Sequence, residues 1–245
     1  MAPRFHIPVL LSPSHVGSTI ALPAEVAHHV VRVLRLARGD PITLFDGSGG
    51  EYAAVLDGIG RSGATARIEA FDAVARESPL AITLAQAILA TDAMAYAIRK
   101  AVELGAGRIA PVVAARSQAL RGERGERRLA HWRAIAIAAC EQCGRNRIPA
   151  IDDVQPLDEW LRASAHGERT AMMDPAAELS LAALAASTPP DAILVGPEGG
   201  LTDAERSFAI DTGVVAAHLG PRVLRAETAG PAALAVLNAV AGDAR

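Results

Sequence analysis

The stretch Ile193–Glu205, ILVGPEGGLTDAE, runs from an apolar strand into a glycine turn and then into the start of a helix. Its three turn glycines permit positive φ angles and a close approach of the backbone to a ligand. Thr202 and Glu205 have the T-x-x-E spacing of a capping box, which fixes where the helix begins. The turn lacks the G-x-G-x-x-G pattern of a dinucleotide fold. It therefore indicates either a tight strand-to-helix connection or a site for another kind of ligand.

Strand and helix patterns alternate on both sides of this stretch, from about residue 80 to the C-terminus. Strands are expected at 80–89, 108–113, 169–174, 191–196 and 214–220. Helices are expected at 92–105, 124–143, 176–187, 203–211 and from about Pro231 onward. This alternation predicts an α/β domain whose mostly parallel sheet is covered on both faces. Ligands of such sheets bind at the carboxyl ends of the strands.

The first 75 residues follow a different pattern. Short apolar runs at 19–22, 42–45, 52–56 and 64–71 are separated by the turns DGSGG and DGIGRSG, which predicts a small β-barrel. One helix is expected at 23–35, with Val26, Val30, Val33 and Leu34 on one face. We therefore expect two domains, 1–75 and 76–245, joined near ARESPL at 75–80.

Composition excludes several classes of protein. Apolar residues make up 51% of the 245 residues, yet no apolar run reaches the roughly 20 residues of a membrane helix. With no signal-peptide pattern either, we expect a soluble, cytoplasmic protein with no membrane partner. Cys140 and Cys143 are the only cysteines, which excludes a disulfide scaffold. No second ligand pair completes a zinc site, so no metal is expected.

Arginine is concentrated between Arg108 and Arg147. This segment has nine Arg and three Glu, so it carries +6 in a chain of net charge −3 and leaves −9 for the rest. A localised basic segment indicates a polyanionic partner or a solvated helix face. The single lysine, Lys100, follows Arg99 and cannot complete a G-x-x-x-x-G-K-[ST] phosphate loop.

Unusual turns follow three of the expected strands: MMDP (172–175), VGPEGG (195–200) and LGPRVLRAET (219–228). Because the three lie in consecutive strand–helix units, they can converge on one crevice. ILVGPEGGLTDAE followed by LGPRVLRAETA resembles the RsmE type of RNA methyltransferase in the SPOUT superfamily. LPAEVAHHVVRVLRLARGDPITLFDGSGGEY is similar to the PUA-like RNA-binding barrel of that family, and IRKAVELG and AIAIAACEQCGRNRIP are similar to its catalytic domain.

The resemblance covers the whole chain, and its implications are specific. It implies a SPOUT-type parallel sheet with a C-terminal trefoil knot, preceded by the PUA-like β-barrel. It further implies a homodimer that uses S-adenosylmethionine to methylate N3 of a uridine in 16S rRNA of the small ribosomal subunit. The methyl-donor contacts carried over to this chain are Met172, Met173, Val195, Gly196, Pro197, Gly199, Leu219, Gly220, Val223 and Leu224.

Three charged residues are candidates for the chemistry. Glu198 is expected to be the base or a donor-orienting group, or else a carboxylate stabilised by a helix terminus. Glu227 is the alternative candidate for the base. Arg225 is expected to stabilise the negative charge that develops on the uracil oxygens.

RNA contacts are expected in two places. Arg32, Arg35 and Arg38 of the barrel are candidates for phosphate contacts. Four polar residues near the end of the basic helix resemble residues close to the active site, although they also suit a plain helix C-terminus: Glu141, Gln142, Arg145 and Asn146.

The chain departs from the family pattern at two motifs. Ala90 and Thr91 stand where the family commonly has Lys and Gly, and Ala226 stands where it has Thr. These changes bear on RNA contacts and donor affinity. Two alternatives are a non-catalytic RNA-binding ribosome assembly factor and a SPOUT methyltransferase that acts on tRNA.

Overall fold

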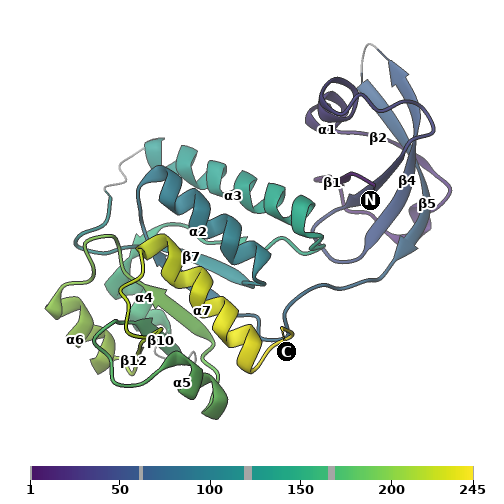
Figure 1. Ribbon diagram of the computed structural model, residues 1–245. Helices are drawn as coiled ribbons and strands as arrows, with labels where there is room; N and C mark the ends of the chain where they lie inside the picture. The colour runs from purple at the N-terminus through teal and green to yellow at the C-terminus, as the bar shows by residue number, and fades with distance from the viewer. Residues whose placement is uncertain (1, 61–62, 119–122, 165–168, 245) are drawn as a thin grey trace. The chain divides into compact units, whose positions relative to one another are not determined.

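The computed structural model describes residues 2–60, 63–118, 123–164 and 169–244. The chain divides into two compact units (Figure 1). The first unit contains Met1–Glu77 together with Cys140–Ile148, and the second contains Ser78–Ala139 and Pro149–Arg245. The chain therefore leaves the first unit, forms part of the second, and returns to the first at Cys140–Ile148. The expected division into 1–75 and 76–245 did not include this return.

The first unit is built on a five-stranded sheet in the order β1-β3-β4-β5-β2. Its strands are β1 (Arg4–His6), β2 (Thr19–Ala21), β3 (Pro41–Phe45), β4 (Glu51–Gly60) and β5 (Gly63–Asp72). β1 pairs with β3 in parallel, and the other pairs are antiparallel. The expected strands at 19–22, 42–45, 52–56 and 64–71 are confirmed. β1 was not predicted.

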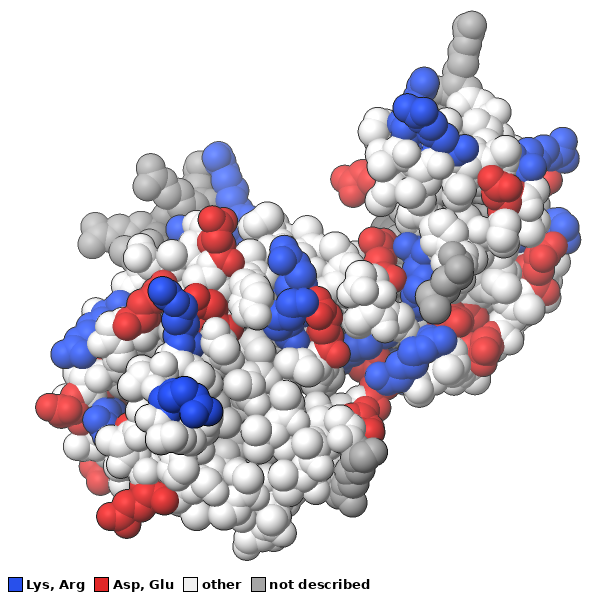
Figure 2. All heavy atoms as spheres, in the orientation of Figure 1, with Lys and Arg blue, Asp and Glu red and all other residues white. Residues whose placement is uncertain are grey.

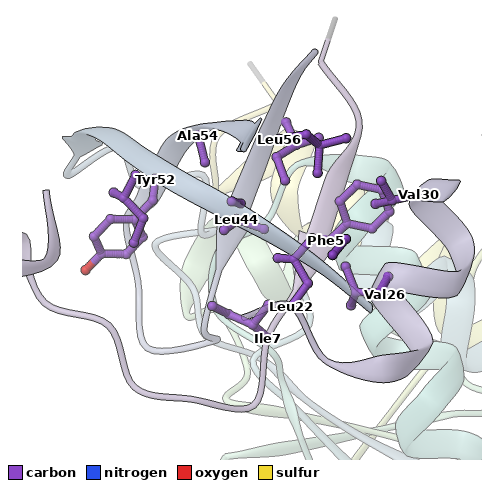
Figure 3. Packing of buried hydrophobic residues seen from close by; sticks show 14 residues of the cluster. Phe5, Ile7, Leu22, Val26, Val30, Leu44, Tyr52, Ala54 and Leu56 are labelled. Carbon is purple, nitrogen blue, oxygen red and sulfur yellow. The ribbon is translucent and has the colours of Figure 1, made fainter. Parts of the chain in front are cut away.

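The sheet wraps around one apolar core (Figure 3). Phe5, Leu22, Leu44 and Leu56 pack there beside residues of α1 (Ala24–His28). The helix expected at 23–35 is shorter than predicted, because a π-helical turn follows it at His29–Val33.

The π-helical turn changes which side chains face the core. A π turn places more residues in each turn than an α-helix, so it rotates the residues that follow it. Val26 and Val30 are buried, but Val33 and Leu34 are 60% and 41% exposed. The four apolar residues that were expected on one face are therefore not buried together.

The second unit is an α/β domain with a parallel sheet, as predicted. The strand order is β12-β10-β11-β6-β7-β8, and β9 also pairs with β7. Every ladder of this sheet is parallel. The strands are β6 (Thr83–Ala87), β7 (Arg108–Val113), β8 (Ala150–Ile151), β9 (Gln155–Pro156), β10 (Thr170–Met173), β11 (Ala192–Val195) and β12 (Val215–Ala217).

Helices cover both faces of this sheet (Figure 1). They are α2 (Thr91–Glu103), α3 (Glu123–Cys143), α4 (Leu157–Ser164), α5 (Leu181–Ser187), α6 (Asp203–Asp211) and α7 (Ala226–Val240). Residues of α4 and α6 pack with β6, β7, β10 and β11 in one core, while α7 packs against α2, α5 and β11. No helix in the described part of the chain is long and apolar enough to cross a membrane. Sequence patterns missed α4 and the two-residue strands β8 and β9.

Two helix starts differ from the predictions. α5 begins at Leu181 and not at Ala176, because the side chain of Ser180 accepts a hydrogen bond from the N–H of Ala183 and caps it there. α7 begins at Ala226, so Pro231 lies inside it. A proline inside a helix removes one backbone hydrogen bond.

The residue before this proline packs closely against the sheet. A Cβ at Gly230 would lie only 3.0 Å from a methyl group of Leu84, so α7 sits very close to β6 at this point.

Candidate functional site

A pocket of about 550 Å³ lies at the carboxyl ends of β10, β11 and β12. This volume is in the range typical of sites for small molecules and cofactors. All ten residues expected to contact the methyl donor line the pocket, as do Glu198, Arg225 and Glu227. The structure therefore brings together the three loops that the sequence indicated, because neighbouring parallel strands end at the same edge of the sheet.

The loop after β11 owes its shape to its glycines. Gly200 has a φ of +70°, and its N–H donates to the carbonyl of Pro197 at 2.8 Å, which closes the turn. Thr202 then caps α6, and the expected capping box with Glu205 is present. The turn therefore ends at a fixed point, and the residues before it face the pocket.

Glu198 is tied to the beginning of α2. Its Oε1 atom accepts a hydrogen bond from the backbone N–H of Ala90 at 2.8 Å. Ala90 is the N-cap residue of α2 and has no side-chain cap of its own. The carboxylate therefore lies at the positive end of a helix. This contact also joins the glycine loop to Ala90 and Thr91, where the chain departs from the family pattern.

A second contact holds the same loop from the end of β7. Nη1 of Arg116 donates to the carbonyl of Gly199 at 2.8 Å. Glu205 accepts hydrogen bonds from the backbone N–H groups of Ala115, at 2.7 Å, and Thr202, at 2.8 Å. Burial raises the pKa of Glu205, but these donors outweigh the burial and the pKa is lowered. The ionised carboxylate thus fixes the β7 loop against α6.

The loop after β12 ends at the start of α7. Arg225 is the N-cap residue of this helix and is exposed. Glu227 lies in the first turn and is half-buried in the pocket wall. Among the residues that the structure describes, neither side chain has a hydrogen-bond or ion-pair partner. Both charged groups are therefore available to a bound substrate.

Sequence reasoning missed one charged pair in the pocket. Asp174 follows β10 directly and is 9% exposed. Its carboxylate accepts from the N–H of Ala176 at 2.9 Å and forms an ion pair with Arg206 of α6. Both members of the pair line the pocket. The MMDP turn was the available signal, because a carboxylate at a strand end faces the ligand crevice.

The three candidate arginines of the first unit are exposed. Arg32 belongs to the π-helical turn, and Arg35 has a φ of +55°, which is uncommon for a residue with a side chain. Arg38 makes an ion pair of 3.3 Å with Asp57 that leaves its side chain 77% exposed. All three are accessible to a phosphate backbone.

The four polar residues that were expected near the active site belong to the segment that returns to the first unit. Gln142 is exposed, and Glu141 accepts from the backbone N–H of His6 at 2.9 Å. Arg145 is 4% exposed and paired with Glu77.

Asn146 is only 1% exposed and connects several parts of the first unit. It accepts from Arg4 at 2.5 Å and donates to Glu51 and to the carbonyl of Val74. Arg145 and Asn146 are therefore both buried and engaged in hydrogen bonds within the first unit, and Asn146 also lines a hollow of that unit.

Glu51 is the centre of this cluster. Arg4 and Arg76 both form ion pairs with it, at 2.5 and 2.8 Å. Burial raises the pKa of Glu51, but hydrogen bonds from Arg76, Arg4 and Asn146 outweigh this effect and hold the pKa at about 2. We call Arg4, Glu51, Arg76 and Asn146 the Glu51 cluster. It binds the returning segment to the sheet of the first unit.

The two cysteines belong to the same segment, and both are free thiols. The thiol of Cys140 is buried and donates to the carbonyl of Arg147 at 3.6 Å. Burial raises the pKa of Cys140 to about 12, so the reactive thiolate is scarce. Among the described residues, no group of three or more His, Cys, Asp or Glu side chains could hold a metal ion.

Three arginines of the basic segment form ion pairs within the chain: Arg108 with Asp152, Arg133 with Asp153 and Arg145 with Glu77. Arg121 lies outside the described residues. Figure 2 shows basic and acidic side chains interspersed on the face that it displays.

Comparison with known protein families agrees with this fold and pocket. An RNA methyltransferase domain matches residues 76–238, and an RNA methyltransferase PUA domain matches residues 22–69. The class of protein is therefore an RNA methyltransferase of the SPOUT type with an N-terminal PUA-like domain.

Individual relatives define the family. The ribosomal RNA small subunit methyltransferase E of Mycobacterium tuberculosis is 32% identical over 91% of this chain and 87% of the relative. The crystal structure of the Neisseria gonorrhoeae methyltransferase E bound to S-adenosyl methionine has a TM-score of 0.91, with 37% identity and 99% of both chains covered. A Legionella pneumophila putative methyltransferase in complex with the same cofactor has a TM-score of 0.89, with 36% identity and 99% coverage of both. The chain belongs to the family of ribosomal RNA small subunit methyltransferase E.

Proposed function

We propose that this protein transfers a methyl group from S-adenosylmethionine to N3 of a uridine in 16S rRNA of the small ribosomal subunit. The observation that carries the proposal is the pocket at the ends of β10, β11 and β12, which is lined by all thirteen residues expected for the donor and the chemistry. Family membership supports the same activity. A cytoplasmic site of action follows from this substrate.

The pocket suits the methyl donor in size and in chemistry. Met172 and Val195 are buried and give it an apolar wall, and the loop Gly196–Gly200 brings backbone groups close to a ligand. Carboxylates of Glu198 and Glu227 at the pocket offset the positive charge of a sulfonium. The donor, when bound, supplies an activated methyl group, so the protein mainly has to position the acceptor.

Glu227 is the better of the two candidate bases. The N3 atom of uracil carries a proton that must leave before the atom can attack a methyl group. Glu198 already accepts a hydrogen bond from Ala90, whereas Glu227 lines the pocket without a partner among the described residues. We assign proton removal to Glu227. Glu198 then positions the loop that surrounds the donor.

Arg225 is suited to the charge that this proton transfer creates. Loss of the N3 proton places negative charge on the two carbonyl oxygens of uracil. Arg225 is exposed at the pocket, at the N-terminal end of α7. Its guanidinium and the positive end of the helix both favour an anion there.

Three further features belong to the proposal. Arg32, Arg35 and Arg38 contact RNA phosphates, which their exposure supports. The loops after β11 and β12 form a trefoil knot around the donor, in keeping with their convergence on one pocket. The protein works as a homodimer, which sedimentation or light scattering tests directly.

Methyl transfer to purified RNA substrates tests the function. Unmodified small ribosomal subunits and tRNA are each incubated with labelled S-adenosylmethionine, and the products are digested for nucleoside mass spectrometry. We expect 3-methyluridine in the ribosomal RNA alone. Label in tRNA identifies a tRNA methyltransferase. Donor binding without transfer to either RNA identifies a non-catalytic assembly factor.

A further inference from the structure

A second hollow lies in the first unit. It has a volume of about 230 Å³ and is lined by Gly49, Gly50, Phe71, residues 73–75 and Arg147, among others. Every lining residue belongs to the first unit, so the hollow is complete within it. Its volume is below the roughly 300 Å³ at which sites for drug-sized ligands begin. A single nucleobase is a ligand of suitable size.

Arg147 provides a flat cationic surface in this hollow. A Cβ built on Gly49 would lie 3.0 Å from Nη2, 3.2 Å from Cζ and 3.2 Å from Nε of Arg147. Because these distances are nearly equal, one face of the guanidinium lies flat over Gly49. The side chain is exposed and has no hydrogen-bond or ion-pair partner among the described residues. Guanidinium planes of this kind stack on unpaired RNA bases.

The surroundings of Arg147 favour a base. Phe71 contributes an aromatic wall, and its ring lies so close to Gly50 that a Cβ there would be 2.5 Å from it. Among the described residues that line the hollow, Glu77 is the only carboxylate, and it accepts hydrogen bonds from Arg145 and from the backbone N–H of Arg147. Its charge is therefore largely offset before a nucleotide arrives.

The hollow is separate from the expected phosphate contacts. Gly49 precedes Glu51 at the beginning of β4, while Arg38 pairs with Asp57, six residues further along the same strand. At about 3.3 Å per residue, Glu51 and Asp57 are about 20 Å apart along β4. A single RNA strand that contacts both would follow β4 along the first unit.

We propose that this hollow is a nucleotide subsite that holds one unpaired RNA base against the guanidinium plane of Arg147. The ligand class is single-stranded RNA, and the base lies between Arg147 and the wall that contains Phe71. Stacking of this kind is tolerant of sequence, because every base presents a π face. The proposal rests on the proposed function only in taking RNA as the polymer.

Two substitutions of the full-length protein separate stacking from charge. We measure the affinity for a short fluorescent single-stranded RNA by anisotropy over a series of salt concentrations. Arg147→Ala should weaken binding about tenfold, as expected for the loss of one stacked base. Arg147→Lys should weaken it to a similar extent, because lysine keeps the charge and loses the plane. The salt dependence of the Lys variant should match that of the wild type.

Arg67→Ala is the matched control. Arg67 is another half-exposed arginine of the first unit, paired with Glu69 and outside the hollow. Its removal should change affinity less than twofold. Unchanged binding by Arg147→Ala would overturn the subsite, and wild-type binding by Arg147→Lys would replace base stacking with a phosphate contact. An equal loss of RNA affinity in Arg67→Ala would also overturn the subsite, because the effect would then not be specific to Arg147.

Methyl transfer to small ribosomal subunits separates this inference from the proposed function. If the wild type methylates no RNA but Arg147→Ala still loses oligonucleotide affinity, the subsite stands and the function fails. If methylation proceeds with the same KM for subunits in Arg147→Ala and the wild type, the function stands and the subsite fails. The expected result is a raised KM for subunits with an unchanged kcat.

Discussion

The Oε1 atom of Glu198 accepts a hydrogen bond from the backbone N–H of Ala90 at 2.8 Å, which links the glycine loop after β11 to the N-cap residue of α2. The only carboxylate of the GPEGG turn is therefore engaged with a helix terminus, 108 residues away in sequence. This hydrogen bond holds one carboxylate oxygen at the helix terminus, and it is the basis on which we propose a positioning role for Glu198.

Glu198→Gln should keep most of the single-turnover rate at saturating donor, because the amide oxygen still accepts from Ala90. Glu198→Ala should weaken donor binding about fivefold, which corresponds to the roughly 1 kcal/mol of one hydrogen bond. Calorimetric titration of donor and single-turnover methyl transfer measure the two effects. A 100-fold loss of rate in Glu198→Gln at saturating donor would make Glu198 the base after all.

Glu227→Gln should lower the single-turnover rate by about 100-fold or more, the usual effect of removing a general base. Donor affinity should stay within a few-fold of the wild type, since the substitution preserves shape. Glu178→Gln is the control, because Glu178 is an exposed carboxylate outside the pocket. Equal rates for Glu227→Gln and the control would remove Glu227 from the chemistry.

Arg116→Ala should raise the KM for the donor about fivefold, since it removes the 2.8 Å hydrogen bond to Gly199 and loosens one wall of the pocket. The kcat should change little, because Arg116 is not among the residues that line the pocket. Steady-state kinetics with varied donor separates KM from kcat. Arg99→Ala, at an exposed position of α2, should leave both constants unchanged.

Glu51→Gln should destabilise the protein near neutral pH. The folded-state pKa of Glu51, about 2, lies below its ordinary value of 4.5. Its ionisation therefore adds stability above about pH 4.5, and this stability is lost as the pH falls toward 2. The shift corresponds to roughly 3 kcal/mol in the free energy of unfolding.

Urea unfolding of the wild type and Glu51→Gln at pH 7 and pH 3 measures this difference, which should be larger at pH 7. Glu69→Gln is the control, because the ion pair of Glu69 with Arg67 is half-exposed and contributes little. A difference of the same size at both pH values would contradict the account of Glu51.

Arg32→Ala should reduce the dependence of RNA affinity on salt. Each lost phosphate contact lowers the slope of log K against log salt by roughly 0.7 to 0.9. Binding titrations across a salt series give the slope directly. Arg162→Ala, at an exposed arginine of α4 paired with Asp158, should keep the wild-type slope.

The convergence of three loops on one crevice was predictable from local patterns, whereas the methyl donor and its contacts were implied only by the resemblance to a family. Glycine turns such as Gly196–Gly200 follow apolar runs, and the ends of parallel strands meet at one edge of the sheet. The contacts that hold the pocket were not predictable. Arg116 reaches Gly199, and Asp174 pairs with Arg206, across 83 and 32 residues of sequence. Such pairs leave no periodic signal.

The errors at helix boundaries have a related cause. A proline such as Pro231 normally marks the start of a helix, but α7 begins five residues earlier, at Ala226. Val33 has the spacing of a buried residue, and the π-helical turn rotates it into solvent. In both cases a tertiary or non-α geometry overrides the local preference.

The returning segment has a consequence for biosynthesis. A nascent chain that has reached Glu77 contains every strand of the first unit but lacks Asn146, the residue that completes the Glu51 cluster. About 70 more residues must be added first, which takes on the order of 4 to 14 s at typical rates of synthesis. Throughout this interval the cluster lacks the hydrogen bonds that Asn146 makes with Arg4 and Glu51. The N-terminal unit, although made first, completes its fold only after the ribosome has passed the middle of the message.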